Sequence, residues 1–260
     1  STIPASYESL IKFILFIEDN DNIEGGIMTK MIRKYLTYIG LTLIVFIVAF
    51  TAKGKEVLVL EPENTVVLRG AIDSVVASDI SYKLLMANQS TSDIIYLVLD
   101  SPGGSISAGN QIIDAINSLT KPVTCISMFA ASMAHAILQS CNTRYTTPTG
   151  VSMIHRAKGG FIGQFNDGEV ESKLNFWRSV VQKMEIRNAE RMGLKLDEYK
   201  KLAANEFWCE GEDCVKTNFV DNIVSLRCSV ELLQSEYTHY SRRSSGAVSA
   251  CPLIRNYLRK

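Results

Sequence analysis

A serine, a histidine and a pair of glycines are spaced along the middle of the sequence in a way that suits nucleophilic catalysis. Ser132 stands among alanines, directly after the apolar segment 123–128. We expect this segment to be a strand that gives way to a helix, whose N-terminus favours negative charge. A serine hydroxyl is a weak nucleophile until a base takes its proton. Ser132 is therefore a candidate nucleophile if the chain supplies a base.

The chain offers three histidines as that base, His135, His155 and His239. His239 lies in a polar tail and is set aside. His135 follows Ser132 by three positions on the same expected helix, and this spacing does not direct an imidazole at a hydroxyl at the helix start. We interpret His135 as a partly buried structural histidine. His155, at the end of a short apolar run, is the candidate base.

Glycines provide candidate donors for a negatively charged oxygen. Gly103 and Gly104 follow the apolar run 95–100, which has strand composition. Because neither glycine carries a Cβ, the backbone can turn sharply there and present its N–H groups. The alternative interpretation is an ordinary tight turn.

Strand and helix patterns alternate around these residues. Short strands are expected at 57–60 and 65–68, and helical periodicity covers 74–86 and 108–118. A long helix with much apolar surface is expected at 169–192. This alternation predicts an α/β fold with a mainly parallel sheet and helices outside it.

Three motifs carry a family resemblance. They are SPGGSISAG at 101–109, AASMA at 130–134 and MIHRAKGGFIGQ at 153–164. In this order and spacing they resemble the Clp protease proteolytic subunit, over about Asn64 to Leu226. The resemblance implies the Clp/crotonase fold, a stack of ββα units with a protruding handle helix at 169–192 and a handle strand at 157–168.

The resemblance also implies a function. It is that of a serine endopeptidase that forms an acyl-enzyme, with Ser132 as nucleophile and His155 as base. The backbone N–H groups of Gly104 and Met133 would form the oxyanion hole.

The third member of the triad departs from the family pattern, which has an aspartate two residues before an aromatic residue. Matching the flanking segments without gaps puts Glu206 at that position, with Trp208 as the aromatic residue. A glutamate can fix and stabilise a catalytic histidine. Asn205 is the alternative if the register slips by one residue, and a plain surface carboxylate is the alternative role for Glu206.

The N-terminal part divides into two expected segments. Residues 1–27 match nothing downstream and are expected to be untranslated or a disordered leader. Within 28–52, the basic residues Lys30, Arg33 and Lys34 precede an uncharged run over 35–52. This run is close to the length that spans a bilayer, and its charge flank favours a cytoplasmic N-terminus. A single-pass anchor and a cleaved signal peptide both fit, and both put the peptidase domain, 53–234, outside the cytoplasm; a buried core helix is the third alternative.

Composition and resemblance together set the expected partners. The chain has 27 Lys and Arg against 27 Asp and Glu, so net charge gives no reason to expect nucleic acid binding. No cofactor and no metal site are expected, because no such motif is present. The resemblance implies peptide or unfolded protein substrates and a homo-oligomeric, heptameric ring. An ATPase partner is not expected, since a domain outside the cytoplasm would meet no ATP.

Two other functions stay open: an inactive scaffold with the same ring-forming surface, and a membrane protease resembling the signal-peptide peptidases of this fold.

Cysteines and the C-terminal tail complete the expectations. If the domain is exported, Cys209 and Cys214 could form a disulfide across the turn between them. Cys125 lies in an apolar strand and is expected to be a buried free thiol. Residues 235–260 are polar and basic, and we expect a disordered tail.

Overall fold

The computed structural model describes residues 34–35, 38, 56–240 and 245–254. The expected segments 1–27 and 28–52 fall outside these residues, apart from three positions. Within the described ranges, no helix has both the length and the apolar character needed to cross a membrane. The fold described below belongs to the compact unit 55–260.

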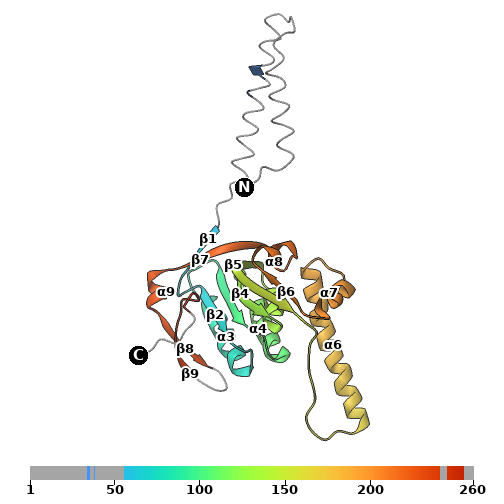
Figure 1. Ribbon diagram of the computed structural model, residues 1–260. Coiled ribbons are helices and arrows are strands. Elements are labelled where there is room, and N and C mark those ends of the chain that lie inside the picture. The colour runs from blue at the N-terminus through green and yellow to red at the C-terminus, as the bar shows by residue number, and fades with distance from the viewer. Residues whose placement is uncertain (1–33, 36–37, 39–55, 241–244, 255–260) are drawn as a thin grey trace, which may run out of the picture. The chain divides into compact units, whose positions relative to one another are not determined.

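A seven-stranded sheet forms the centre of this unit (Figure 1). Its strand order is β1-β7-β5-β4-β3-β2, with β6 paired to β5 beside this path. The strands are β1 Glu56–Leu60, β2 Thr65–Arg69, β3 Ile95–Ser101, β4 Val123–Ala131, β5 Thr143–Ile154, β6 Phe207–Glu210 and β7 Asn222–Cys228. All pairings are parallel except that between β5 and β6. The expected α/β architecture, consistent with the Clp/crotonase-like fold, is confirmed.

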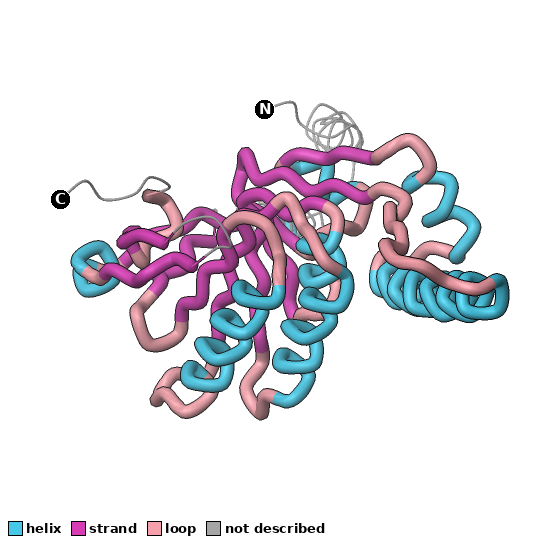
Figure 2. The backbone as a smooth tube through the Cα atoms, turned by 90° about the horizontal axis from the view of Figure 1, so that it is seen from below, coloured by secondary structure: helices cyan, strands magenta, loops and turns pink. Residues whose placement is uncertain are grey.

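Two helices lie against one face of the sheet, α3 Ser74–Ala87 and α4 Ile106–Ser118 (Figure 2). The side chain of Asp73 accepts hydrogen bonds from two N–H groups and caps α3, and the side chain of Ser105 accepts one from Ala108 and caps α4. Their buried faces meet the inward side chains of β2, β3 and β4 in one apolar core. This packing fixes the strands whose ends carry the candidate site.

The strand β5 changes its neighbour partway along. Its first half pairs with β7, at Tyr145 and Thr146. Its second half, from Val151 to Ile154, pairs with β6. The two halves thus bring different segments of the C-terminal region to the end of β5, where His155 follows.

The long helix α6, Asp167–Arg191, projects from the rest of the fold (Figure 1). Asn166 and Glu169 form a capping box at its start, which fixes where the helix begins. Its buried residues are Asn188 and Ala189 alone, near its C-terminal end. The short helices α7 Leu196–Ala203 and α8 Glu212–Lys216 follow.

The residues before α6 differ from expectation, because 157–166 form no strand. Three glycines interrupt this stretch, and it pairs with none of the described strands.

The C-terminal segment is also more ordered than expected. The short helix α9, Val230–Gln234, leads into an antiparallel hairpin of β8 Glu236–Tyr240 and β9 Ser245–Ser249. A disulfide joins Cys228 to Cys251, and Arg69 donates hydrogen bonds to the carbonyls of three residues between 251 and 254. These contacts correct the expectation of a disordered tail for residues 235–240 and 245–254.

All six cysteines of the chain pair in the structure, as 125–141, 209–214 and 228–251. The hypothesis of a Cys209–Cys214 bridge matches the structure. The expectation of a free thiol at Cys125 is wrong. Cys125 lies on β4, and Cys141 lies in the short segment between α5 and β5. Their Cα atoms are 5.8 Å apart, a distance that a disulfide can span.

Candidate active site

Ser132 lies at the sharp turn between β4 and the helix α5, Met133–Leu138. Its φ of 57° is in the left-handed region, which a non-glycine residue adopts at an energetic cost of about 1–3 kcal/mol. The Ser132 N–H donates to the carbonyl of Met153 on the neighbouring strand, which holds the turn in place. The fold thus presents this hydroxyl on a strained, fixed turn.

His155 is the side chain that meets this hydroxyl. It follows the end of β5, which runs parallel to β4, so the two residues emerge at the same edge of the sheet. His155 Nε2 lies 2.8 Å from Ser132 Oγ, within hydrogen-bond distance. The two sequence-predicted residues are therefore in contact, in a geometry that allows the imidazole to take the hydroxyl proton.

The glycine pair and Met133 surround the same hydroxyl. Gly104, Met133, Ser132 and His155 line one cavity. At Gly103, with φ of 90°, a Cβ atom would lie 2.6 Å from the Ala131 carbonyl oxygen and 2.7 Å from the Met133 nitrogen. Only glycine allows the backbone at residue 103 to approach the turn at Ser132 so closely. An ordinary tight turn would not impose this requirement.

The other ring nitrogen of His155 marks where a third member would act. His155 Nδ1 is buried and has no hydrogen-bond partner among the described residues. Glu206 is exposed, and no hydrogen bond joins it to His155 within the described part of the chain. Asn205 is exposed as well. The structure thus brings Ser132 and His155 together, and it shows neither candidate third side chain bonded to the histidine.

The contacts of His135 are those of a structural residue, as expected. Its side chain is fully buried, whereas partial burial was expected. Its Nδ1 lies 2.9 Å from Ser152 Oγ, and its ring packs 4.6 Å from that of Phe219. Burial lowers the pKa of His135 to about 3, and the charge of Arg144 contributes in the same direction. The ring is therefore neutral near pH 7 and lies outside the cavity that contains Ser132.

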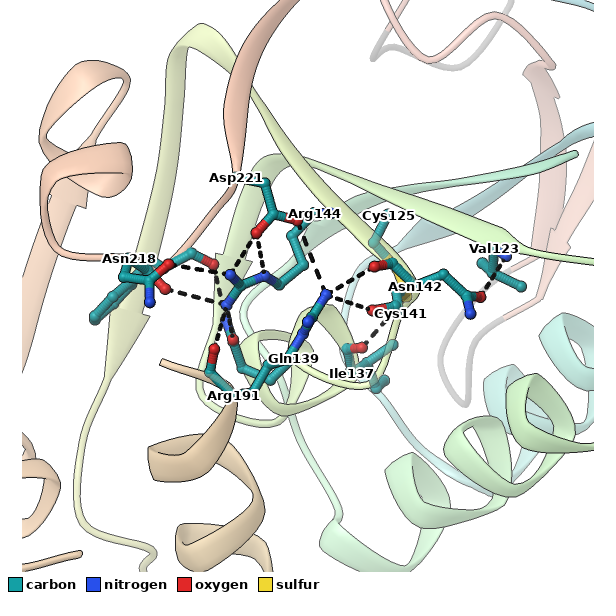
Figure 3. Close-up of polar contacts among 11 residues, drawn as sticks. Val123, Cys125, Ile137, Gln139, Cys141, Asn142, Arg144, Arg191, Asn218 and Asp221 are labelled. Atoms are coloured by element: carbon teal, nitrogen blue, oxygen red, sulfur yellow. Dashed lines mark hydrogen bonds and ion pairs between the residues drawn. A yellow bond between two sulfur atoms is a disulfide. The ribbon is translucent and has the colours of Figure 1, made fainter. Parts of the chain in front are cut away.

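A buried arginine ties together the elements that carry the site (Figure 3). Arg144 on β5 donates to both the Asp221 carboxylate and the Gln139 side chain, and it also reaches the carbonyls of Arg191 and Asn218. Gln139 caps the C-terminal end of α5, and Arg191 ends α6. Arg144 therefore fixes the helix that follows Ser132 relative to the helix that projects from the fold.

The sequence did not reveal several residues of the cavity. Its volume is about 170 Å³, and its lining also includes Met184 and Asn188 of α6 and Tyr199 of α7. These residues lie far from the motifs along the chain. No pattern in the sequence singled out these residues, and it is the structure that shows Asn188 at the buried end of α6. Among the residues that the structure describes, no group of three His, Cys, Asp or Glu side chains could hold a metal ion.

Comparison with known proteins agrees with this geometry. The Clp protease family model matches residues 53–227. The chain is 30% identical over 165 residues to the ATP-dependent Clp protease proteolytic subunit 2 of Tropheryma whipplei (strain Twist), covering 62% of this chain and 91% of that protein. It is 29% identical over 167 residues to the ATP-dependent Clp protease proteolytic subunit of Streptococcus mutans serotype c, covering 62% of this chain and 85% of the relative.

Proposed function

Because the chain belongs to the Clp protease family and is a serine-type endopeptidase, we propose that Ser132, His155 and Glu206 form its catalytic triad. The observation that carries this proposal is the 2.8 Å contact between Ser132 Oγ and His155 Nε2 at the edge of a cavity. A base in hydrogen-bond contact with a serine hydroxyl is what acylation of that serine requires.

The reaction then follows in two steps. His155 Nε2 takes the proton of Ser132 Oγ as the oxygen attacks the peptide carbonyl, and the N–H groups of Gly104 and Met133 hydrogen-bond to the oxyanion. His155 next gives the proton to the leaving amine, which departs and leaves an acyl-enzyme. A water molecule, deprotonated by His155, hydrolyses this ester and restores Ser132.

The pairing of β5 with β6 supports Glu206 as the third member. Ile154 and Phe207 are the last pair of this antiparallel ladder, and His155 and Glu206 are the residues that directly adjoin this pair. Asn205 lies one residue further from the ladder, which favours Glu206 over Asn205.

Labelling with a fluorophosphonate tests the proposed triad, because the reagent bonds covalently to an activated serine. The purified full-length chain is expected to be labelled, and Ser132→Ala is expected to lose all labelling. His155→Ala should slow labelling by about 10²–10⁴-fold. Absence of labelling in a correctly folded parent chain would favour the alternative of an inactive scaffold.

We also propose that the chain assembles into a ring-forming homo-oligomer and that α6 packs on a partner subunit in it. This helix buries only two of its residues, and Val170 and Phe176 are exposed on it. Exposed apolar side chains on a projecting element commonly mark a subunit interface. Light scattering should give the mass of a heptamer for the parent chain and a smaller mass for Phe176→Glu, while Lys183→Glu on the same helix serves as the control for a change of charge.

The paired cysteines support an extracytoplasmic location of the peptidase domain. Structural disulfides persist in oxidising compartments and are rare in the cytosol of most organisms. We therefore propose that residues 28–52 are a membrane anchor or a signal peptide and that this chain hydrolyses peptides without ATP. Fusion of a periplasmic-type phosphatase reporter after residue 254 should be active, and an inactive fusion with a stable fold would contradict the export.

A further inference from the structure

The cavity beside Ser132 contains two buried polar side chains that the proposed triad does not use. Asn188 is 1% exposed and Tyr199 is 3% exposed, and both line the cavity. Asn188 Nδ2 donates a hydrogen bond to the Tyr199 hydroxyl, at 3.2 Å. Within the described chain, Asn188 Oδ1 has no hydrogen-bond partner.

An unpaired amide atom in a buried site is uncommon, because losing water there without a replacement costs free energy. Turning the Asn188 amide over does not give both of its polar atoms a hydrogen-bond partner. If Asn188 turned over, its oxygen would accept from the Tyr199 hydroxyl and its nitrogen would then be the unpaired atom. In either orientation, one buried amide atom of Asn188, a residue that lines the cavity, has no partner within the described chain.

The other lining residues restrict what can pair with this atom. Ile106, Met133, Ile154 and Met184 supply the apolar part of the walls, and polar residues supply the rest. The volume of about 170 Å³ is below the ~300–1,000 Å³ of typical small-molecule pockets, so the cavity suits a single side chain. Lys158, the only lysine in the lining, is exposed, and a charged substrate side chain would have no buried partner of opposite charge.

We propose that this cavity binds the side chain of the substrate residue whose carbonyl Ser132 attacks, the P1 residue, and that it selects glutamine there through Asn188. The inference rests on the proposed function of Ser132. A glutamine has an aliphatic stem for the apolar walls and a terminal amide that can both donate and accept. A glutamine side chain can therefore hydrogen-bond to the unpaired amide atom of Asn188 in either orientation of that amide. A methionine side chain, of similar length, leaves this atom unpaired.

The test compares cleavage of two quenched fluorescent peptides by the purified full-length chain. The peptides differ only at P1, glutamine in one and methionine in the other, and mass spectrometry verifies the bond that is cut. The parent chain is expected to favour glutamine by about tenfold or more in kcat/KM. A third peptide with glutamate at P1 should be cleaved less efficiently than the glutamine peptide, because its charge would be buried.

Two variants assign the preference to Asn188. Asn188→Leu is expected to bring the ratio of glutamine to methionine to one or below. Gln111→Leu, the same change on the exposed face of α4, should keep the parent ratio. A ratio does not depend on the fraction of active protein, so partial misfolding of a variant does not alter it. The parent ratio alone still decides the proposal if Asn188→Leu does not fold.

The outcomes separate this inference from the proposed function. Cleavage by the parent chain with methionine equal or preferred would overturn the glutamine preference and leave the serine peptidase intact. An Asn188→Leu variant that keeps the parent ratio would overturn the role of Asn188. Fluorophosphonate labelling without cleavage of the glutamine peptide would also overturn the preference, while absence of both labelling and cleavage would overturn the proposed function and this inference with it.

Discussion

His155 and Glu206 directly adjoin Ile154 and Phe207, the last facing pair of β5 and β6. Glu206 has a φ of 62°, so the chain bends out of the strand at this residue. On the histidine, Nδ1 is buried and has no hydrogen-bond partner in the described chain. A hydrogen bond from His155 Nδ1 to the Glu206 carboxylate would complete the proposed triad at this end of the ladder.

We expect Glu206→Gln to lower kcat/KM for peptide hydrolysis by about 10²–10⁴-fold. An amide can orient the His155 ring, but it does not stabilise the positive charge that the ring gains during acylation. Asn205→Ala is the matched control and should change kcat/KM by less than about threefold. Steady-state kinetics on one peptide measure both. The opposite pattern, a large loss for Asn205→Ala alone, would show that the third member is Asn205.

The buried His135 makes stability depend on pH. Burial lowers the pKa of His135 to about 3, against about 6.5 in an unfolded chain. Below pH 6.5 the unfolded chain binds a proton that the folded chain does not, so stability is lost as the pH falls from about 6.5 toward 3. Between pH 7 and pH 5 this difference corresponds to about 2 kcal/mol in the free energy of unfolding.

Denaturant unfolding at pH 7 and pH 5 measures this effect. His135→Gln removes the titrating group and retains a partner for Ser152 Oγ. We expect the variant to be less stable at pH 7 and to lose about 2 kcal/mol less than the parent between the two pH values. An equal loss in parent and variant would exclude His135 as the cause.

Local patterns allowed much of the fold to be predicted from the sequence. The strand expected at 95–100 extends over Ile95–Ser101, and the helix expected at 74–86 extends over Ser74–Ala87. Apolar runs and helical periodicity are properties of consecutive residues, so the chain itself carries this information. The pairing of Ser132 with His155 was predicted on other grounds, by elimination among the histidines and by the family resemblance, and the adjacency of β4 and β5 accounts for it in the structure.

Other features depend on residues that are distant along the chain. Nothing near Asn188 indicates that α6 and α7 bring it to the cavity beside Ser132. Six cysteines allow 15 pairings. The short spacing of Cys209 and Cys214 suggests one of them, but nothing in the sequence near Cys125 indicates Cys141 as its partner. The C-terminal residues have a polar composition typical of a disordered tail, yet one disulfide and the contacts of Arg69 hold them against the sheet.

A non-reducing peptide map should find the three disulfides 125–141, 209–214 and 228–251. Chain entropy predicts that the bridge with the longer loop contributes more to stability. Cysteine-to-alanine replacement of the pair Cys228 and Cys251, 23 residues apart, should cost about 3 kcal/mol, and replacement of Cys209 and Cys214, 5 residues apart, about 2 kcal/mol. Chemical denaturation of the two double variants measures this order, and a different set of linked peptides would contradict the connectivity.

The ion pair of Arg144 and Asp221 should matter more to stability than an exposed pair does. The Arg144 side chain is 3% exposed, so removing its carboxylate partner leaves a buried charge without compensation. Its hydrogen bonds to Gln139 and to two carbonyls offset part of the cost. We expect Asp221→Asn to lower the free energy of unfolding by about 2 kcal/mol.

Asp79→Asn is the control, because Asp79 pairs with Lys83 within α3 and both side chains are about a quarter exposed. This substitution should cost less than about 1 kcal/mol. The ion pair of Arg144 and Asp221 also makes the stability of the fold depend on pH in acid. Partial burial raises the pKa of Asp221, but the hydrogen bonds and charge of Arg144 outweigh burial and hold the pKa below its usual value. The stability that the pair contributes is therefore present above the usual aspartate pKa and is lost as the pH falls through the lowered one. Asp221→Asn should remove this part of the acid sensitivity, and equal costs for Asp221→Asn and Asp79→Asn at pH 7 would contradict the central role given to Arg144.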